Sequence, residues 1–528
     1  MGVPVRGADE TDKKVKEERM KGHGMAKTLT KRFLCIVLVL LMLSMVACSE
    51  SANAKDGQTE GSDAGTTVTD PTVSPEAEEE TEISYDPGVP VNDYGGYTFT
   101  FYIRKCGSNF WTVKDIWVEE LSGDALNDAI YNRNDYINNT YNISVAQEYM
   151  GDNGACSSYV AKMVTAGENM DAVICNGNDT TSIAGKGQLL DLKDVPYLNL
   201  EQRWWDQNSI HDLSLCGKIF FAAGELTEAD NNAVNVIAFV KDNITDYHLD
   251  DPYELVRDGK FTMDKFAELS NAVLTDKNGD GKYNEADVIG YLYFGDSGQT
   301  MFNALGNMCA VLDQNGDPQI TFLTDRSVES WTKLINFIQQ DCTLSMSTEL
   351  DVYKGMGDYD VKVKMIEGKN TLFSWVHMRD IENLREVESD FGILPNPKFD
   401  EAQERYCNEN DPYGTGFFSV PITCADPERT GILIEAFSAR SMQVVLPAYY
   451  DITLQGKYMR DDDSLEMLEI IFDSVIYDIG RFYNWGSMYG TISSMWNAKA
   501  DTFASSFEKS VKIVNKSMEK TLKTYGGE

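Results

Sequence analysis

The chain has 528 residues and a formal net charge of −38, from 84 acidic and 46 basic side chains. A surface this acidic repels nucleic acid and anionic lipid, which excludes a nucleic-acid-binding protein. The four histidines lie far from one another in the sequence, which argues against zinc catalysis. Residues 94–528 are too many for one compact core, so we expect two domains or lobes.

The N-terminal region has the organisation of a secretory signal. Residues 33–47 form an uninterrupted apolar run, and at 15 residues it is shorter than the ~20 residues of a membrane-spanning helix. Basic residues, the last of them Arg32, precede the run, and the small residue Ala47 ends it. This order predicts a signal peptide over 1–47. An uncleaved anchor helix is the alternative, and it would also place the rest of the chain outside the cell.

Cys48 directly follows this region. The string Met45-Val46-Ala47-Cys48 resembles the lipobox of bacterial lipoproteins, with Met in place of the usual Leu at its first position. The resemblance implies cleavage before Cys48 and a lipid on its thiol, which would hold the protein on the extracellular face of a Gram-positive cell membrane. Residues 1–19 are a mixed-charge stretch that a signal peptide does not need, so we expect translation to begin at Met20 or Met25.

An acidic linker follows, so that residues 48–93 comprise the lipidated cysteine and a spacer. Between positions 49 and 90, eleven acidic residues stand against the single Lys55. The stretch has almost no aliphatic side chains, so it cannot bury enough apolar surface to offset the entropy of ordering. Repulsion between its charges favours an extended chain. We expect a disordered spacer that lifts a folded domain off the membrane.

The ten cysteines do not have the spacing of a disulfide framework. Cys35 lies in the signal peptide and Cys48 takes the lipid, which leaves eight that are scattered singly along the chain. No pair has the short spacing of a disulfide-stapled module or a metal knuckle. We expect the eight to be mostly buried free thiols.

The folded part begins with alternating strands and helices. Its β-branched and aromatic residues predict a strand over 97–102, and apolar residues at helical spacing predict a helix over about 124–141. A strand over 143–145, a helix over 156–166 and a strand over 171–175 are expected next. Strands that alternate with helices predict a parallel sheet in an α/β fold.

Polar residues follow the last of these strands. Asn176, Asn178 and Asp179 would lie at the carboxyl edge of the sheet, where such folds bind ligands, although Asn-Gly is also an ordinary turn. Further on, residues 235–240 predict a buried strand, and Thr262 is placed to cap a helix whose apolar face carries Phe266, Leu269 and Val273.

The strongest local motif spans residues 276–287. Oxygen-bearing side chains fall at loop positions 1, 3, 5, 9 and 12, with Gly281 at position 6. The spacing matches the calcium loop of an EF-hand, although Asp287 replaces the usual bidentate Glu and resembles the loops of cellulosomal dockerins. Residues 313–318 echo the motif but end in proline, which favours a hairpin turn. A metal-free turn is the alternative to a structural Ca²⁺ held by Asp276, Asn278, Asp280, the carbonyl of Lys282, Asn284 and Asp287.

Together these features resemble an extracellular solute-binding protein of an ABC importer, in particular the carbohydrate-binding family that includes maltose-binding protein. Residues 368–375 resemble that family's strand ending in a sugar-facing tryptophan, and 391–398 resemble the following strand with its Leu-Pro end. Residues 418–441 resemble the segment that recrosses between the lobes into a long helix. The order of these segments carries the resemblance, which covers most of 94–528.

The resemblance implies a periplasmic-binding-protein-like fold of two α/β lobes, with the calcium loop inserted and crossing strands as hinges. Lobe 1 is expected to comprise 94–240 with 418–458, and lobe 2 to comprise 241–417 with 459–528. Such a protein would be a monomer and not an enzyme, capturing a carbohydrate, expected to be an oligosaccharide, for delivery to ABC permease subunits. The crossings are expected near 236–241, 416–422 and 456–460.

Sugar recognition needs flat aromatic faces and planar polar side chains. Trp375 is the strongest candidate, because its strand-end position and the family resemblance agree. Packing in the core is the alternative for each aromatic residue, and Trp204 and Trp205 could be either core residues or a surface anchor. The full set of ligand-binding candidates is Trp375, Asn109, Trp111, Asn178, Asp179, Glu225, Asp230, Tyr413, Trp485 and Tyr489.

Two other functions stay open. An acidic extracellular chain can be a glycoside hydrolase, which needs two carboxyl groups about 5–10 Å apart, although no recognisable catalytic string is present. The same fold can also capture a peptide or another solute. Aromatic platforms in the cleft would favour a sugar, whereas a charged pair for peptide termini would favour a peptide.

Overall fold

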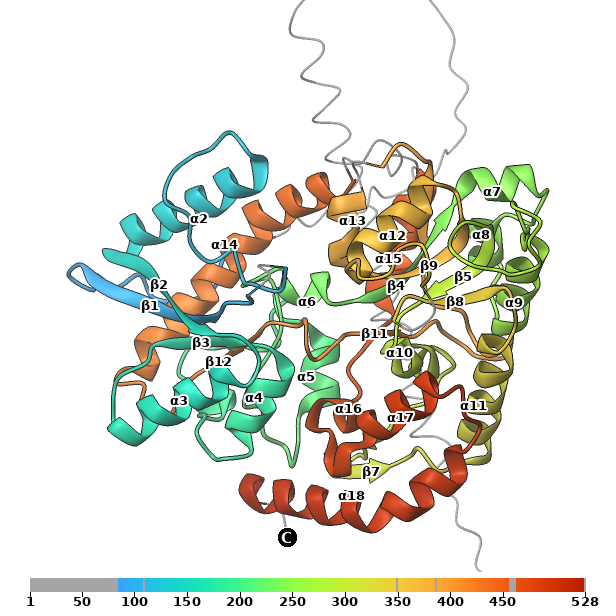
Figure 1. Ribbon diagram of the computed structural model, residues 1–528. Coiled ribbons are helices and arrows are strands. Elements are labelled where there is room, and N and C mark those ends of the chain that lie inside the picture. Colours follow the sequence, from blue (N-terminus) through green and yellow to red (C-terminus); the bar gives the residue numbers. More distant parts are fainter. Residues whose placement is uncertain (1–83, 108–109, 348–349, 385–386, 455–461, 527–528) are drawn as a thin grey trace, which may run out of the picture. The chain divides into compact units, whose positions relative to one another are not determined.

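The computed structural model describes residues 84–526 apart from 108–109, 348–349, 385–386 and 455–461 (Figure 1). The predicted signal peptide, Cys48 and most of the linker lie outside the described residues. Residues 82–528 group as one compact unit. No helix in the described ranges is both long enough and apolar enough to cross a membrane.

The first of two large sheets has the strand order β12-β3-β1-β2. Its strands are β1 (Tyr97–Arg104), β2 (Ile143–Gly151), β3 (Ala172–Cys175) and β12 (Phe417–Ser419). The three strands expected first along the chain are thus confirmed, and β1 runs parallel to both of its neighbours. The sheet is nevertheless mixed, because β12 pairs antiparallel with β3.

Side chains of β1 alternate between two cores, as the pleat of a strand requires. Phe99 and Phe101 are buried in a core that also includes residues of α2 and α14, whereas Tyr102 belongs to the core that includes residues of α3 and α4. The two pairs of helices cover opposite faces of the sheet (Figure 1). These helices are α2 (Ala125–Tyr141), α3 (Ala155–Ala166), α4 (Gly177–Ala184) and α14 (Pro427–Leu454).

Trp204 and Trp205 belong to the core of the first sheet, with 1% and 2% of their surface exposed. Both indole N–H groups donate to the carboxylate of Glu435 on α14. Burial raises the pKa of Glu435 to about 7, so the two tryptophans hydrogen-bond a carboxylate that has lost most of its water. The tryptophan pair is therefore a core feature and not a surface anchor.

The second sheet has the order β10-β4-β9-β5-β8. Its strands are β4 (Asn235–Val240), β5 (Ile289–Tyr293), β8 (Thr343–Ser345), β9 (Thr371–His377) and β10 (Phe391–Leu394). β5 pairs parallel with β8 and β9, whereas β4 pairs antiparallel with β9 and β10.

The expected Thr262 cap is confirmed, since its side chain accepts from Lys265 N at the start of α9 (Met263–Ala272). Phe266 of α9 stacks on Phe373 of β9 with 4.5 Å between ring centroids.

Two short ladders complete the pairing. β6 (Ala310–Leu312) and β7 (Pro318–Ile320) form the hairpin expected around residues 313–318. β11 (Asn408–Glu409) pairs parallel with β13 (Val475–Ile476). The other helices are α5 (Gln207–Leu213), α6 (Ala229–Asn232), α7 (Lys241–Asp246), α8 (Pro252–Arg257), α10 (Ser297–Ala304), α11 (Asp325–Ile338), α12 (Asp358–Glu367), α13 (Met378–Leu384), α15 (Asp462–Asp473), α16 (Ile479–Tyr483), α17 (Met488–Asn497) and α18 (Phe503–Tyr525), with 3-10 turns at Leu192–Asp194 and Trp485–Ser487.

The eight cysteines of the described chain are free, and all except the half-buried Cys216 are buried. This confirms the prediction of buried thiols. Of the expected crossings, 236–241 includes most of β4 and 416–422 includes β12, while 456–460 lies outside the described residues. The lobe boundaries themselves stay a prediction.

A candidate ligand-binding cavity

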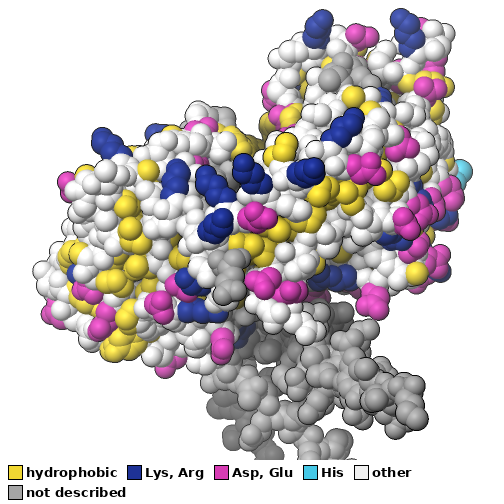
Figure 2. Space-filling view, turned by 90° about the horizontal axis from the view of Figure 1, so that it is seen from below, with side chains coloured by type: hydrophobic (Ala, Val, Ile, Leu, Met, Phe, Trp, Pro, Cys, Tyr) yellow, Lys and Arg dark blue, Asp and Glu magenta, His cyan; other side chains and the backbone are white. Residues whose placement is uncertain are grey.

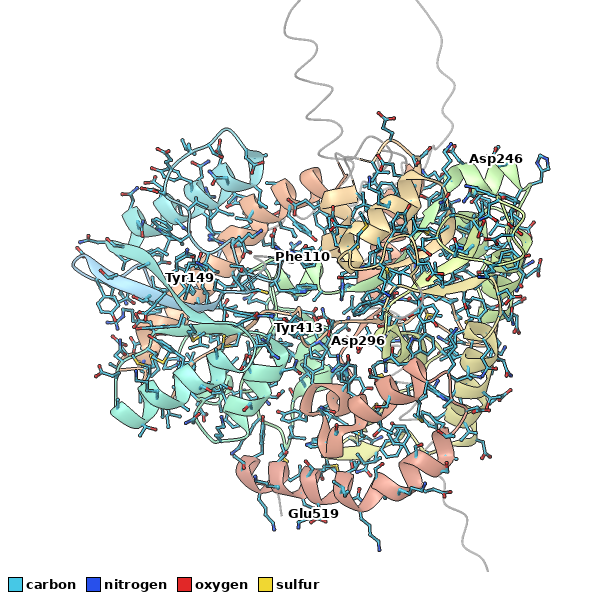
Figure 3. All side chains as sticks on the ribbon, viewed as in Figure 1. Phe110, Tyr149, Asp246, Asp296, Tyr413 and Glu519 are labelled. Atoms are coloured by element: carbon cyan, nitrogen blue, oxygen red, sulfur yellow. The ribbon has the colours of Figure 1, made fainter. Side chains whose placement is uncertain are left out.

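A cavity of about 1020 Å³ is lined by segments from both sheets. Residues of α4 border it on the side of the first sheet, and residues of β4 and β9 border it on the side of the second. Figure 3 shows three of the lining side chains, Phe110, Tyr413 and Asp296, near the middle of the described unit. Aromatic rings make up much of the wall, namely Phe110, Trp111, Phe294, Tyr359, Trp375, Tyr413, Phe482, Tyr483, Trp485 and Tyr489.

The structure brings together six of the ten ligand-binding candidates, although they span more than 370 positions of the sequence. The six that line the cavity are Trp111, Asn178, Trp375, Tyr413, Trp485 and Tyr489. Asn109 lies outside the described residues.

The other three candidates lie away from the cavity lining. Asp179 is buried, and its carboxylate accepts from the N–H groups of Gly154 and Ser157 at the start of α3. Burial raises the pKa of Glu225 to about 8 and also raises that of Asp230. The geometry gives Asp179 a capping role, and a ligand-binding role for these three residues stays an untested prediction.

Trp375 lies at the cavity but is not an open platform. Only 3% of its surface is exposed, because Phe294 stacks parallel to it at 5.7 Å and the Lys362 ammonium lies 4.6 Å from its ring centre. Its indole Nε1 has no hydrogen-bond partner within the described residues. Trp375 therefore offers the cavity a buried donor more than a flat face.

Trp111 contributes a more accessible ring, and like Trp375 it contacts the ring of His377. It is half-buried and makes perpendicular contacts with His377 at 4.9 Å and with Tyr413 at 6.4 Å. The backbone of Gly414 lies against it, since a Cβ at that position would come within 2.5 Å of the indole. This close packing holds the ring in place.

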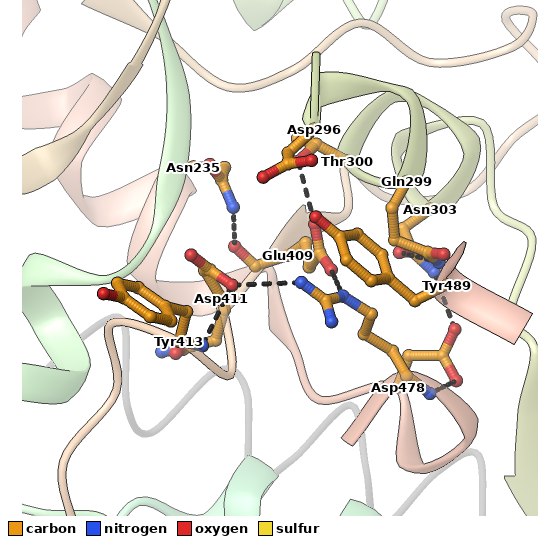
Figure 4. Close-up of polar contacts among 12 residues, drawn as sticks. Asn235, Asp296, Gln299, Thr300, Asn303, Glu409, Asp411, Tyr413, Asp478 and Tyr489 are labelled. Carbon is orange, nitrogen blue, oxygen red and sulfur yellow. Dashed lines mark hydrogen bonds and ion pairs between the residues drawn. The ribbon is translucent and has the colours of Figure 1, made fainter. Parts of the chain in front are cut away.

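A network of buried charges connects three segments at the cavity (Figure 4). Arg481 of α16 lies 3.2 Å from Asp411 and 3.3 Å from Glu409, and its guanidinium lies 3.5 Å from the centre of the Tyr489 ring. Glu409 also accepts from Thr300 Oγ1 at 2.8 Å. Burial raises the pKa of Glu409 to about 8, although Arg481 opposes the shift.

His377 continues this network to β9. Its Nε2 lies 3.5 Å from Asp411 Oδ2. Burial alone would raise the pKa of Asp411, but the hydrogen bond with His377 and the charge of Arg481 hold it below the ordinary value of 3.8. Asp411 is therefore a carboxylate that is shared between β9 and α16.

A second buried ion pair lies beside His377. Lys362 of α12, 1% exposed, donates to Asp380 Oδ2 at 2.8 Å, and the His377 backbone N–H donates to the same oxygen at 2.9 Å. Burial opposes ionisation of Asp380, yet the charges of Lys362 and His377 hold its pKa below 3.8. The carboxylate thus keeps its charge inside the protein.

The cavity also carries an acceptor that is not hydrogen-bonded. Asn235 is 1% exposed and lies opposite His377 in the pairing of β4 with β9. Its Nδ2 donates to the carbonyl of Glu409, but its Oδ1 has no partner in the described part of the chain. Buried polar atoms in native proteins are almost always hydrogen-bonded, and Asn235 and Trp375 both line the cavity, so Asn235 Oδ1 and Trp375 Nε1 are candidate contacts for a polar ligand.

Sequence reasoning missed most of these charged residues. His377 could have been predicted from the sequence, because it lies two residues after the candidate Trp375, and residues two apart on a strand share a face. Asp411 is likewise two residues from Tyr413. Arg481 and Lys362 had no such indication, since each lies on a helix whose contact with the cavity appears only in the folded chain.

Solved structures with this arrangement include ABC solute-binding proteins. Lmo0181 from Listeria monocytogenes, in complex with cycloalternan, has a TM-score of 0.51 and 12% identity over 82% of this chain and 100% of that chain. The maltose/maltodextrin-binding domain MalE from Bdellovibrio bacteriovorus, bound to maltotriose, has a TM-score of 0.50 and 13% identity over 81% of this chain and 100% of that chain. UgpB from Mycobacterium tuberculosis, in complex with glycerophosphocholine, has a TM-score of 0.50 and 12% identity over 80% of this chain and 99% of that chain.

The sequence itself matches no protein-family model and no curated protein. The structural likeness confirms the resemblance at the level of the fold. The chain has the two-lobed α/β fold of ABC solute-binding proteins, including the maltose/maltodextrin-binding ones.

Replacing Asp380 by alanine should destabilise the protein by about 3 kcal/mol, because the buried Lys362 would lose its close partner and keep only the half-exposed Asp358 at 3.7 Å. The double variant Lys362→Met/Asp380→Asn should recover part of this loss, since neither side chain is then charged. The pKa of Asp380 is lowered in the folded state, so its stabilisation is present above its unfolded pKa and is lost as the pH falls through the folded pKa. Urea unfolding at pH 7 and pH 3 measures both effects, and equal stability of the single and double variants would contradict them.

Proposed function

We propose that the protein captures an oligosaccharide in this cavity and delivers it to the permease of an ABC importer. The fold supports a binding protein of this class, in which closure around a ligand is a hinge movement of two lobes. The proposal concerns the ligand and its delivery, for which the cavity chemistry supplies the argument.

The observation that carries the proposal is the pair of unsatisfied atoms among aromatic rings. Trp375 Nε1 needs an acceptor and Asn235 Oδ1 needs a donor. A hydroxyl group is both a donor and an acceptor, so a polyol satisfies both atoms with one kind of group. The apolar faces of sugar rings pack against aromatic side chains such as Trp111, which explains why polar and aromatic groups occur together here.

A peptide ligand fits this cavity less well. Capture of peptide termini calls for one accessible cation and one accessible anion. Both basic side chains of the described lining, Lys362 and Arg481, already pair with carboxylates of the protein. A hydrolase is also disfavoured, because Glu409 and Asp411 both pair with the same arginine.

Binding of maltotetraose, cellotetraose and related neutral oligosaccharides should raise the melting temperature and change the tryptophan fluorescence. Trp111→Ala should weaken the binding of any such ligand about tenfold or more, because an aromatic wall of the cavity is removed. Trp117→Ala is the matched control, since that indole is 38% exposed and does not line the cavity.

Isothermal titration of the three proteins measures the affinities. An oligosaccharide panel without a single binder would contradict the proposal. An equal loss of affinity in Trp111→Ala and Trp117→Ala would contradict it as well. Release of new reducing ends during the titration would instead support the hydrolase.

We also propose that the loop of residues 276–287 binds a structural Ca²⁺. Asp276 accepts from the N–H groups of Gly279 and Gly281, and these bonds lower its pKa, so it is ionised. Among the described residues, no three His, Cys, Asp or Glu side chains are grouped to hold a metal by themselves. A calcium ion would therefore depend on the oxygens of Asn278, Lys282 and Asn284 as well, and an all-oxygen donor set suits this hard cation.

Calcium at millimolar concentration should stabilise the protein by about 2 kcal/mol if it exceeds Kd some twentyfold. Melting curves in CaCl₂ and in EGTA test this. Asp280→Ala should abolish the calcium-dependent shift, whereas Asp313→Ala, in the related hairpin turn, should keep it. A shift of the same size in both variants, or none in the wild type, would reject the site.

For the N-terminal region we propose a lipid on Cys48 that holds the protein at the outer face of the cell membrane. The sequence pattern supports this proposal. Cys48→Ala should leave the protein unlipidated and uncleaved at this site, which fractionation and intact-mass measurement would detect. A wild-type protein whose mass lacks the diacylglyceryl group would refute the anchor.

A further inference from the structure

The charges around the cavity are strongly biased in sign. Five acidic side chains line it, those of Asp296, Asp358, Asp380, Glu409 and Asp411, against the two cations of Lys362 and Arg481, although burial raises the pKa of Glu409. An acidic lining would say little alone, because buried carboxylates are commonly paired. The state of each cation decides what the cavity can recognise.

Neither cation is available to a ligand. Lys362 contacts Asp380 at 2.8 Å and Asp358 at 3.7 Å, and the ring of Trp375 lies beside it. Arg481 is 6% exposed, contacts two carboxylates and lies over the ring of Tyr489. An anionic group entering the cavity would have to replace a buried carboxylate partner, which leaves that carboxylate unpaired at a cost of several kcal/mol.

Asp296 differs from the other carboxylates. It precedes α10, is exposed, and has no ion pair within the described residues. Its hydrogen-bond partners are Ser493 Oγ at 3.5 Å and Tyr489. Figure 4 shows Asp296 at the edge of the charge network, between Asn235 and Tyr489. It is thus an exposed negative charge on the cavity wall, and its field also acts on the nearby Arg481.

The outer surface of α18, which also borders the cavity, carries exposed positive charges. Helix α18, at the lower edge of Figure 1, has five exposed lysines, and Lys and Arg side chains are prominent on the face seen from below in Figure 2. The same helix presents neutral Ser517 and Thr521 to the cavity. These lysine side chains are exposed to solvent, and none of them is among the residues that line the cavity.

We propose that the cavity selects saccharides without negative charge, either neutral or amine-bearing, and rejects uronates, sulfated sugars and phosphosugars, with Asp296 as the residue that sets the preference. The inference rests on the proposed function, since it concerns which saccharide the cavity accepts. The unpaired atoms of Asn235 and Trp375 give the cavity its affinity for hydroxyl groups, and the paired cations with Asp296 give it selection by charge.

The test compares glycans that differ only in charge. Maltotetraose and cellotetraose are titrated alongside their C6-oxidised uronate forms and their 2-amino forms at 20 mM and 300 mM salt. The wild type should bind a neutral or amino form and bind the matching uronate at least tenfold more weakly. Asp296→Asn should raise the ratio of uronate to neutral affinity about tenfold, because one close charge is removed. Added salt should narrow the wild-type difference.

Asp341→Asn is the matched control, since it removes an exposed carboxylate outside the cavity lining and should leave the ratio unchanged. A uronate that binds the wild type as tightly as its neutral form would overturn the charge selection while leaving saccharide capture intact. A ratio that moves equally in both variants would overturn the role of Asp296. Folded protein that binds no form of either glycan, nor any other saccharide, would reject capture and selection together.

Discussion

The pairing of Arg481 with Asp411 and Glu409 is the interaction on which the cavity depends. The arginine comes from α16, Glu409 is the last residue of β11, and Asp411 follows it by two positions. Asp411 also contacts His377 on β9. Buried charges are tolerated only when they are paired, so this network constrains three segments that the chain supplies from distant positions. The position of Tyr413, two residues beyond Asp411, follows from the same constraint.

The aromatic wall and the charge network stabilise each other. Lys362 lies against Trp375 and Arg481 lies against Tyr489, so each cation is shielded on one side by a ring and on another by a carboxylate. Cation–π contacts are strongest where water is excluded, which is the situation at both sites. The rings thereby lose open faces, and only the N–H group of Trp375 is left without a partner in the described part of the chain.

The sequence allowed local patterns to be predicted, but not contacts across the cavity. The β-branched and aromatic content of β1 and the turn chemistry at 313–318 are local features of the sequence, so the strand and the hairpin were predictable. Asp179 shows the limit, since its place after a strand suggested a ligand but gave no sign that its carboxylate accepts from the N–H groups that begin α3. Arg481 and Glu409, 72 positions apart, have no periodic relation to reveal their pairing.

Both cations of the cavity pair with carboxylates of the protein itself, and this affects how a ligand would be released as well as which ligand would be selected. Under the proposed function, ligand binding would neither make nor break a buried ion pair, so the free energy of closure would come from aromatic burial and from hydroxyl hydrogen bonds to atoms such as Asn235 Oδ1. These contributions would be individually about 1 kcal/mol and would be made one sugar ring at a time. A transport protein must give up its ligand, and an affinity assembled from many small contacts can be lost stepwise as the lobes separate, whereas a buried ion pair to the ligand would have to break at once. The charge network therefore shapes the cavity without contributing a strong contact that release would have to overcome.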